Sequence, residues 1–144
     1  MTDMSGSFSG RVRVLTAISL ADISGHELQT VEIGGAQNSS DLNWNAARVT
    51  YWGVSDVVTG NGTQRGYFVH ERADGNRDWG TFEGQVTTNQ DGTVINGTWR
   101  FAEGSGKLAG LIGQGTYQTR VTSPTAVECT WQGRYELAAA TRAA

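Results

Sequence analysis

The sequence predicts an all-β fold, a single eight-stranded antiparallel β-barrel over residues 1–144. Polar and apolar residues alternate along most of the chain, and an apolar period of 3.6 residues is nearly absent. Turn-forming pairs such as Asn61-Gly62, Asp74-Gly75 and Asp91-Gly92 separate the alternating runs. The composition, with 20 glycines and one proline, excludes a proline-rich disordered chain.

Eight alternating runs follow one another with mostly short connections, which is typical of an antiparallel meander. We expect this meander to close into a barrel, because closure leaves no exposed sheet edge. The polar segment Ala36–Asn45 is expected to be a loop or lid, and residues 1–7 and 138–144 are expected to be flexible ends. The predicted strands are Arg11–Ser19, Glu27–Ile33, Arg48–Val58, Gln64–Arg72, Trp79–Thr88, Thr93–Phe101, Leu111–Thr122 and Val127–Leu137.

The last four runs indicate which face points inward. One parity combines glycine with large apolar residues, which suits the interior of a small barrel, and the other carries mostly Thr, Gln and charged residues. In Arg48–Val58 and Gln64–Arg72, however, both parities carry large residues, as where Tyr51 precedes Trp52. A strand that is apolar on both faces is covered on both faces. The outer cover is then either the N-terminal segment or another copy of the chain, in a homodimer or homotrimer.

Composition also excludes several classes of function. Eleven basic and fourteen acidic residues give a net charge of −3 with no basic stripe, so we expect no nucleic-acid partner. No apolar run is long enough for a transmembrane helix, and MTDMSGSFSG lacks the pattern of a secretory signal, so we expect no membrane partner and a cytoplasmic location. Cys129 is the only cysteine, and the two histidines lack metal-ligand spacing, so no metal or other cofactor is expected.

The candidate catalytic residues are His70, Glu71, Glu83 and Tyr67. They lie on two runs that are expected to pair, and a histidine or glutamate beside aromatic rings can act as an acid or base. Because side chains alternate, only one of His70 and Glu71 can reach the lumen. The other interpretation places His70 on the outer face among Glu and Arg cross-strand pairs, and the pattern favours this second interpretation.

Aromatic side chains are the candidate ligand-binding residues, although aromatic rings are also the usual filling of a core this small. Trp44 and Trp52 lie near the polar segment and are the better candidates for a pocket mouth, whereas Trp99 and Trp131 fit a structural role. The full predicted set is Trp44, Tyr51, Trp52, Phe68, Trp79, Phe82, Trp99, Phe101, Tyr117, Trp131 and Tyr135.

The stretch Gly97–Tyr117, GTWRFAEGSGKLAGLIGQGTY, together with the closing Arg134-Tyr135-Glu136-Leu137, resembles a group of small, largely uncharacterised bacterial barrel proteins. These are similar to the allene oxide cyclase/dirigent barrel class, which is calycin-like in shape. The resemblance covers the C-terminal half of the chain and extends more loosely to Tyr51. Its motifs are glycines and aromatic residues, so it implies a fold and assigns no catalytic residue.

Two functions follow as expectations. In the first, the lumen binds a small apolar molecule, and any chemistry is a cofactor-independent cyclisation or isomerisation of an apolar or polyunsaturated substrate. In the second, the barrel is a non-catalytic structural or interaction protein that works by oligomerising or through its outer surface. The volume of the lumen separates them, because a ligand pocket requires roughly 300 Å³.

Overall fold

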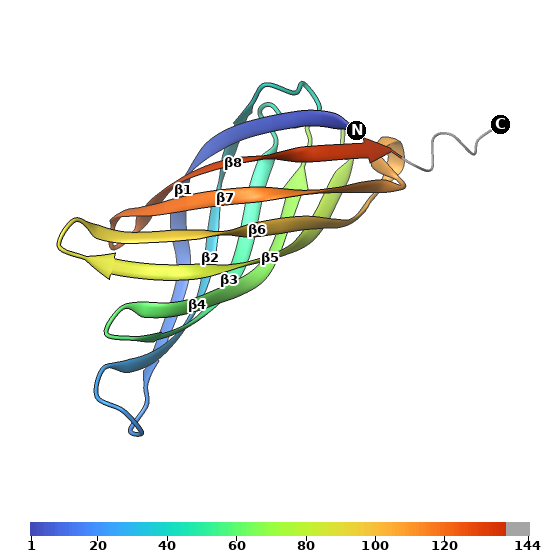
Figure 1. Cartoon of the computed structure of the whole chain (residues 1–144). Coiled ribbons are helices and arrows are strands. Elements are labelled where there is room, and N and C mark those ends of the chain that lie inside the picture. Colours follow the sequence, from blue (N-terminus) through green and yellow to red (C-terminus); the bar gives the residue numbers. More distant parts are fainter. Residues whose placement is uncertain (138–144) are drawn as a thin grey trace.

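The computed structural model describes residues 1–137 and forms a closed antiparallel β-barrel of eight strands (Figure 1). Each strand pairs with its neighbours in sequence, and β1 closes the barrel against β8. The fold class predicted from the alternation is therefore confirmed. The strands are β1 (Thr2–Ser19), β2 (His26–Ser39), β3 (Arg48–Val58), β4 (Asn61–Glu71), β5 (Arg77–Asn89), β6 (Gly92–Gly104), β7 (Leu111–Ser123) and β8 (Ala126–Leu137).

Two segments differ from the sequence-based prediction. Residues 2–7 lie in β1 and pair with β8, so the prediction of a flexible N-terminal end is wrong. The first four residues of Ala36–Asn45 extend β2, and only residues 40–47 connect β2 to β3. The short polar side chains at both sites carry little strand signal, and pairing with distant strands decides their structure. The predicted flexible end at 138–144 lies outside the described residues.

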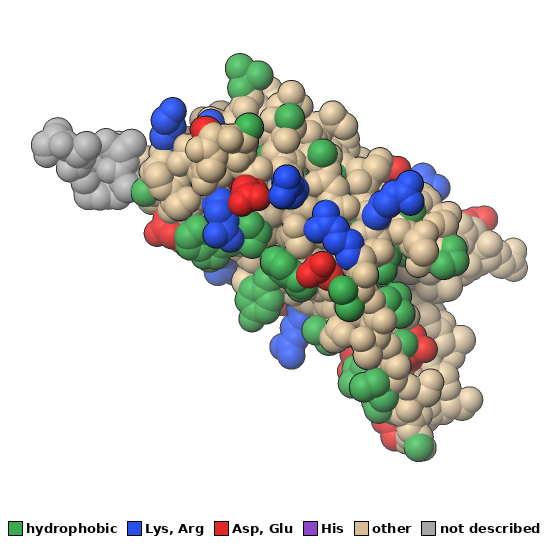
Figure 2. Space-filling model, turned by 180° about the vertical axis from the view of Figure 1, so that it is seen from behind, with side chains coloured by type: hydrophobic (Ala, Val, Ile, Leu, Met, Phe, Trp, Pro, Cys, Tyr) green, Lys and Arg blue, Asp and Glu red, His purple; other side chains and the backbone are tan. Residues whose placement is uncertain are grey.

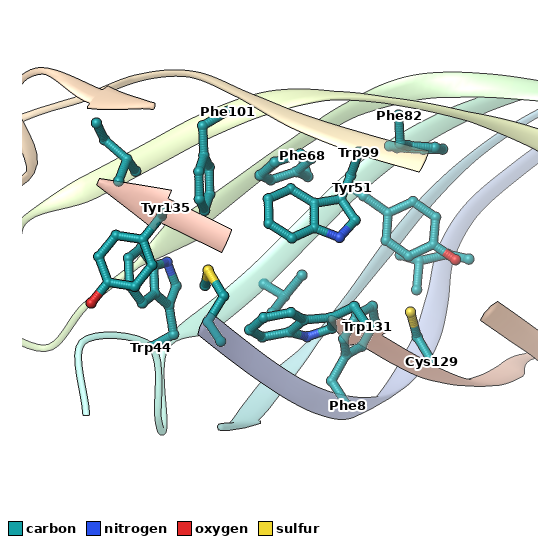
Figure 3. Packing of buried hydrophobic residues seen from close by; sticks show 14 of the residues in the cluster. Phe8, Trp44, Tyr51, Phe68, Phe82, Trp99, Phe101, Cys129, Trp131 and Tyr135 are labelled. Carbon is teal, nitrogen blue, oxygen red and sulfur yellow. The ribbon is translucent and has the colours of Figure 1, made fainter. Parts of the chain in front are cut away.

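The inward parity predicted for the last four strands is confirmed. Buried residues alternate with exposed ones along β5 to β8, and the buried ones meet in a single core. Figure 3 shows this core as a column of rings, with Trp44 and Tyr135 toward one end and Tyr51 and Phe82 toward the other. Most ring pairs in it meet edge to face, for example Trp99 with Trp131 at 6.0 Å, which is a favoured aromatic geometry.

Glycines let the strands approach these rings at the barrel waist. A Cβ added to Gly66 would meet the Trp52 carbonyl oxygen, and would lie 2.6 Å from Cζ of Phe82. Gly53, its cross-strand partner, has nothing closer than 3.5 Å to such a Cβ. At the waist, glycines therefore alternate with large aromatic residues, so that the rings fill the space that the glycines leave, as small barrels require.

A short 3-10 turn, η1 (Gly106–Leu108), connects β6 to β7. Its Leu108 is buried and completes the core at the same end as Trp44. Over residues 1–137, the chain contains no helix that is long and apolar enough to cross a membrane.

Candidate functional site

A chain of polar side chains is buried among the aromatic rings at one end of the barrel. His70 on β4 and Asp78 on β5 are register partners, and His70 Nδ1 lies 2.8 Å from Asp78 Oδ1. On its other side, His70 Nε2 lies 3.0 Å from the side-chain nitrogen of Gln37 on β2. Asp78, Gln37 and His70 are 0%, 2% and 9% exposed, so the site is shielded from bulk water.

An indole N–H lies at each end of this side-chain network, and these two donors fix the direction of every hydrogen bond within it. Trp131 Nε1 can only donate, and it donates to Gln37 Oε1 at 2.9 Å. The Gln37 amide nitrogen must then donate to His70 Nε2, so Nε2 accepts and Nδ1–H donates to Asp78. Trp44 Nε1 donates to the second oxygen of Asp78 at 2.7 Å. Every polar atom is satisfied by a neutral His70 and an ionised Asp78.

The β2–β3 connection closes this end of the barrel with Trp44. This side chain is fully buried, stacks on Phe101 with ring centroids 5.7 Å apart, and meets the edge of Tyr135 at 4.7 Å. The Tyr135 hydroxyl donates to Asp41 of the same connection at 2.6 Å. The pKa of Tyr135 is raised by burial and by this hydrogen bond to Asp41. The part of the predicted loop or lid that lies outside β2 is thus a short connection whose Trp44 side chain fills this end of the barrel.

An internal cavity of about 70 Å³ lies in the lumen next to His70. Liquid water occupies about 30 Å³ per molecule, so this space is large enough for about two waters. It is well below the roughly 300 Å³ of an ordinary ligand pocket, so the volume of this closed lumen, taken alone, favours the expected non-catalytic structural barrel. The polar part of its lining is His70, Gln37, Gln64, Tyr117, Thr119 and Cys129, and its aromatic part is Phe8, Tyr51, Phe68, Phe82, Trp99, Phe101 and Trp131.

The other titratable groups of the lumen remain protonated near neutral pH. Burial raises the pKa of the Cys129 thiol to about 11. Burial likewise raises the pKa of the Tyr51 and Tyr117 hydroxyls, and Tyr117 donates a hydrogen bond to Gln64 at 3.1 Å. Neutral thiol and phenol groups are weak nucleophiles, so His70 is the group of this lumen that is suited to accept a proton.

The structure separates the predicted catalytic residues. His70 is inside, so the favoured interpretation that placed it on the outer face is wrong. Glu71, Glu83 and Tyr67 lie on the outer face, where they cannot act with His70. The reason is the strand alternation itself, because these three have the opposite parity to His70 and to its pairing partner Asp78. The predicted ion pairing does hold for Glu71, which lies 3.6 Å from Arg48.

The predicted ligand-binding aromatics divide in the same way. Trp52 and Trp79 are 41% and 37% exposed on the outer face, so their assignment to the pocket is wrong. The other members of the set point inward, and Trp44 and Tyr135 lie at the plugged end rather than on the cavity wall. The inward members are Trp44, Tyr51, Phe68, Phe82, Trp99, Phe101, Tyr117, Trp131 and Tyr135.

Sequence reasoning missed Asp78 and Gln37. Asp78 has the inward parity of Gly80 and Phe82, so the alternation contained a signal for it. Gln37 belongs to the segment interpreted as a loop, and nothing local indicated that it is buried. Within residues 1–137, no group of three or more His, Cys, Asp or Glu side chains is placed to hold a metal ion.

Comparison with known proteins adds no assignment to this geometry. The chain matches no protein-family model, no curated protein and no solved structure. The fold is that of an all-β eight-stranded barrel and is compatible with the calycin-like class.

Proposed function

We propose that this protein is a small-molecule-binding barrel in which His70 serves as the base of a cofactor-independent isomerisation or cyclisation. The observation that carries the proposal is the orientation of His70, with Nδ1 held by Asp78, which is not on the cavity wall, and Nε2 in contact with Gln37, which is. Once a substrate displaces the Gln37 amide, Nε2 can take a proton from it, and the buried carboxylate at Nδ1 stabilises the imidazolium until the proton returns to another atom of the product.

In this proposal the protein's own residues divide the work. A substrate donor takes the place of the Gln37 amide at His70 Nε2, and the aromatic walls hold the substrate in one conformer. The cavity of about 70 Å³ holds only a few atoms, so a larger apolar substrate requires the Trp44 plug to withdraw. Side-chain hydrogen bonds that hold the plug include Trp44 with Asp78, Tyr135 with Asp41 and Arg72 with Asn43, and backbone hydrogen bonds attach the same connection to Ser5 and Gln37.

Nuclear magnetic resonance of the two histidine rings tests this proposal. His70 is inside the barrel and His26 is outside, so each titration contains its own control. We expect the small probes phenol, indole and 2-cyclohexenone to shift the ring nitrogen resonances of His70 saturably and to leave those of His26 in place. Absence of a shift at His70 with all three probes, or equal shifts at both rings, would contradict binding in the lumen.

A variant with a wider entrance makes the test sharper. In Trp44→Ala, access to the cavity no longer requires the plug to move, so the affinity for indole should rise at least tenfold over the wild type. Leu42→Ala, in the same connection but 88% exposed, is the matched control and should bind like the wild type. If Trp44→Ala is folded and binds none of the probes, the lumen is a packed core and the proposal fails.

A further inference from the structure

The outer face of the barrel carries an apolar surface that the interior site does not use. It is formed by Trp52, Val54, Tyr67 and Trp79, here called the Trp52 surface, with exposed fractions of 41%, 42%, 67% and 37%. Trp52 and Tyr67 are register partners on β3 and β4, and Trp79 follows on β5. Seen from behind, hydrophobic side chains gather across this side of the molecule with charges of both signs among them (Figure 2).

The size of this surface matches one half of a protein interface. With about 150–250 Å² for each whole aromatic side chain, the exposed fractions sum to about 400 Å². One side of a standard interface covers about 800 Å², of which about 450 Å² is non-polar. Trp52 is also held in one position, because its Nε1 donates to Glu32 Oε1 at 2.8 Å. Preordered aromatic side chains of this kind are the usual centre of a protein interface.

The shape of this face fits a second barrel. A hollow of about 1700 Å³ runs around the waist of the barrel outside all eight strands, and Trp52, Val54, Arg65, Tyr67 and Glu83 belong to the part of its lining on this face. The barrel is convex around its circumference and concave along its strands here, as expected of a hyperboloid. A saddle of this form is complementary to itself when one copy is turned by about 90°, because each concave direction then receives a convex one.

Charge also favours a second copy over an anionic partner. Beside the Trp52 surface lie Glu32 and Glu83, and Arg65 and Arg100 face the same hollow. Two acidic and two basic groups give this face no single sign, so it does not attract the phosphates of a nucleic acid or an anionic membrane. Two identical copies can instead place Arg against Glu across a two-fold axis.

We infer that the chain forms a homodimer through the Trp52 surface, with the two barrels crossed waist against waist. Trp52 and Tyr67 lie at the centre of this interface, and the interface is isologous. The side chains of the Trp52 surface point away from the lumen, so the test of the dimer does not depend on whether the interior site binds a ligand.

Sedimentation velocity of the full chain between 1 and 200 µM tests the dimer. We expect the wild type to sediment as a dimer, and Tyr67→Lys to raise the dissociation constant at least 100-fold because it buries an unpaired charge at the centre. Trp52→Arg should act in the same way. Thr130→Lys is the matched control, because this exposed residue lies on the outer face of β8 and does not line the hollow.

The outcomes are distinct. A wild type that is monomeric at 200 µM, or that forms a trimer, overturns the inference. A dimer that both Tyr67→Lys and Trp52→Arg leave intact places the interface elsewhere and also overturns it. Circular dichroism of each variant checks that the barrel is folded. If Thr130→Lys also loses the dimer, the loss is not specific to the Trp52 surface, and the inference fails.

Discussion

The two histidines of this chain have opposite hydrogen-bonding requirements. His70 has a donor at Nε2 and a carboxylate at Nδ1, and this arrangement fits the neutral ring. His26 has Asp22 at Nδ1, 2.7 Å away, and Asp56 at Nε2, 2.6 Å away. Carboxylates only accept, so both nitrogens of His26 donate and the ring is an imidazolium in this arrangement. One histidine is therefore placed as a base, and the other as a cation that links β2 to β3 and to the β1–β2 connection.

Asp78→Asn should destabilise the barrel by about 3 kcal/mol, because one buried amide hydrogen must face another donor. The indoles of Trp44 and Trp131 are donors at both ends, so no rotation of Gln37 or change of His70 tautomer removes the conflict. Urea unfolding measures the effect. Trp131→Phe removes the donor at one end, so the double variant should lose less than the sum of the two single losses. Strict additivity would contradict the coupled network.

Stability should fall as the pH rises through the pKa of His26. The hydrogen bonds to Asp22 and then to Asp56 raise the pKa of His26 above 6.5. A raised pKa adds stability that is complete below 6.5 and is lost above the folded-state pKa. The advantage of the wild type over His26→Gln in unfolding temperature should therefore be larger at pH 5.5 than at pH 8.5. An advantage that grows with pH would show that the ring is not an imidazolium here.

At the scale of elements, the β2–β3 connection is the part of the fold closest to the interior site. It spans only residues 40–47, but it inserts Trp44 into the core and contains Ala46, whose φ of 67° is unfavourable for a side-chain-bearing residue. Trp44 is also the residue of this connection that fills the end of the core above Asp78. Under the proposed function, this is the element that must move before a larger ligand reaches His70.

Replacing Trp44 should separate its packing from its hydrogen bond. Trp44→Ala should cost about 3–5 kcal/mol, the usual range for a large aromatic residue removed from a core. Trp44→Phe should cost about 1–3 kcal/mol, because it keeps most of the stacking on Phe101 and leaves Asp78 with one donor fewer. Leu42→Ala, at an exposed position of the same connection, should change stability by less than about 0.5 kcal/mol. Equal losses for both Trp44 variants would contradict a contribution from ring packing.

At the scale of the whole molecule, closure of the barrel depends on glycines at positions where a Cβ would meet a neighbouring strand or ring. Gly66→Ala should cost about 3 kcal/mol, because its Cβ meets the Trp52 carbonyl oxygen and the Phe82 ring. Gly53→Ala, at the position paired with it, should cost no more than about 1 kcal/mol, since its Cβ has only ordinary contacts. Thermal unfolding compares them. Similar losses at both positions would mean that strand propensity, and not the space at the waist, determines the effect.

Local pattern predicted much of the barrel and little of its polar interior. The bounds of β3, Arg48–Val58, follow from the sequence, and so does the inward parity of the last four strands. The pairing of residues 2–7 with β8 was not predictable, because it joins the two ends of the chain and residues 2–7 carry only one large apolar side chain, Met4. The burial of His70 was missed for a related reason. A histidine goes inside only where partners such as Asp78 and Gln37 satisfy it, and those partners come from other strands.

The ¹⁵N resonances of the two imidazole rings report directly which nitrogens carry protons. For His70 we expect a protonated Nδ1 and an unprotonated Nε2, the form that is able to accept a proton from a bound molecule. For His26 we expect protons on both nitrogens at pH 5.5. A His70 ring that carries its proton on Nε2, or on both nitrogens at pH 7.5, would reverse the hydrogen-bond chain and contradict its assignment as the base.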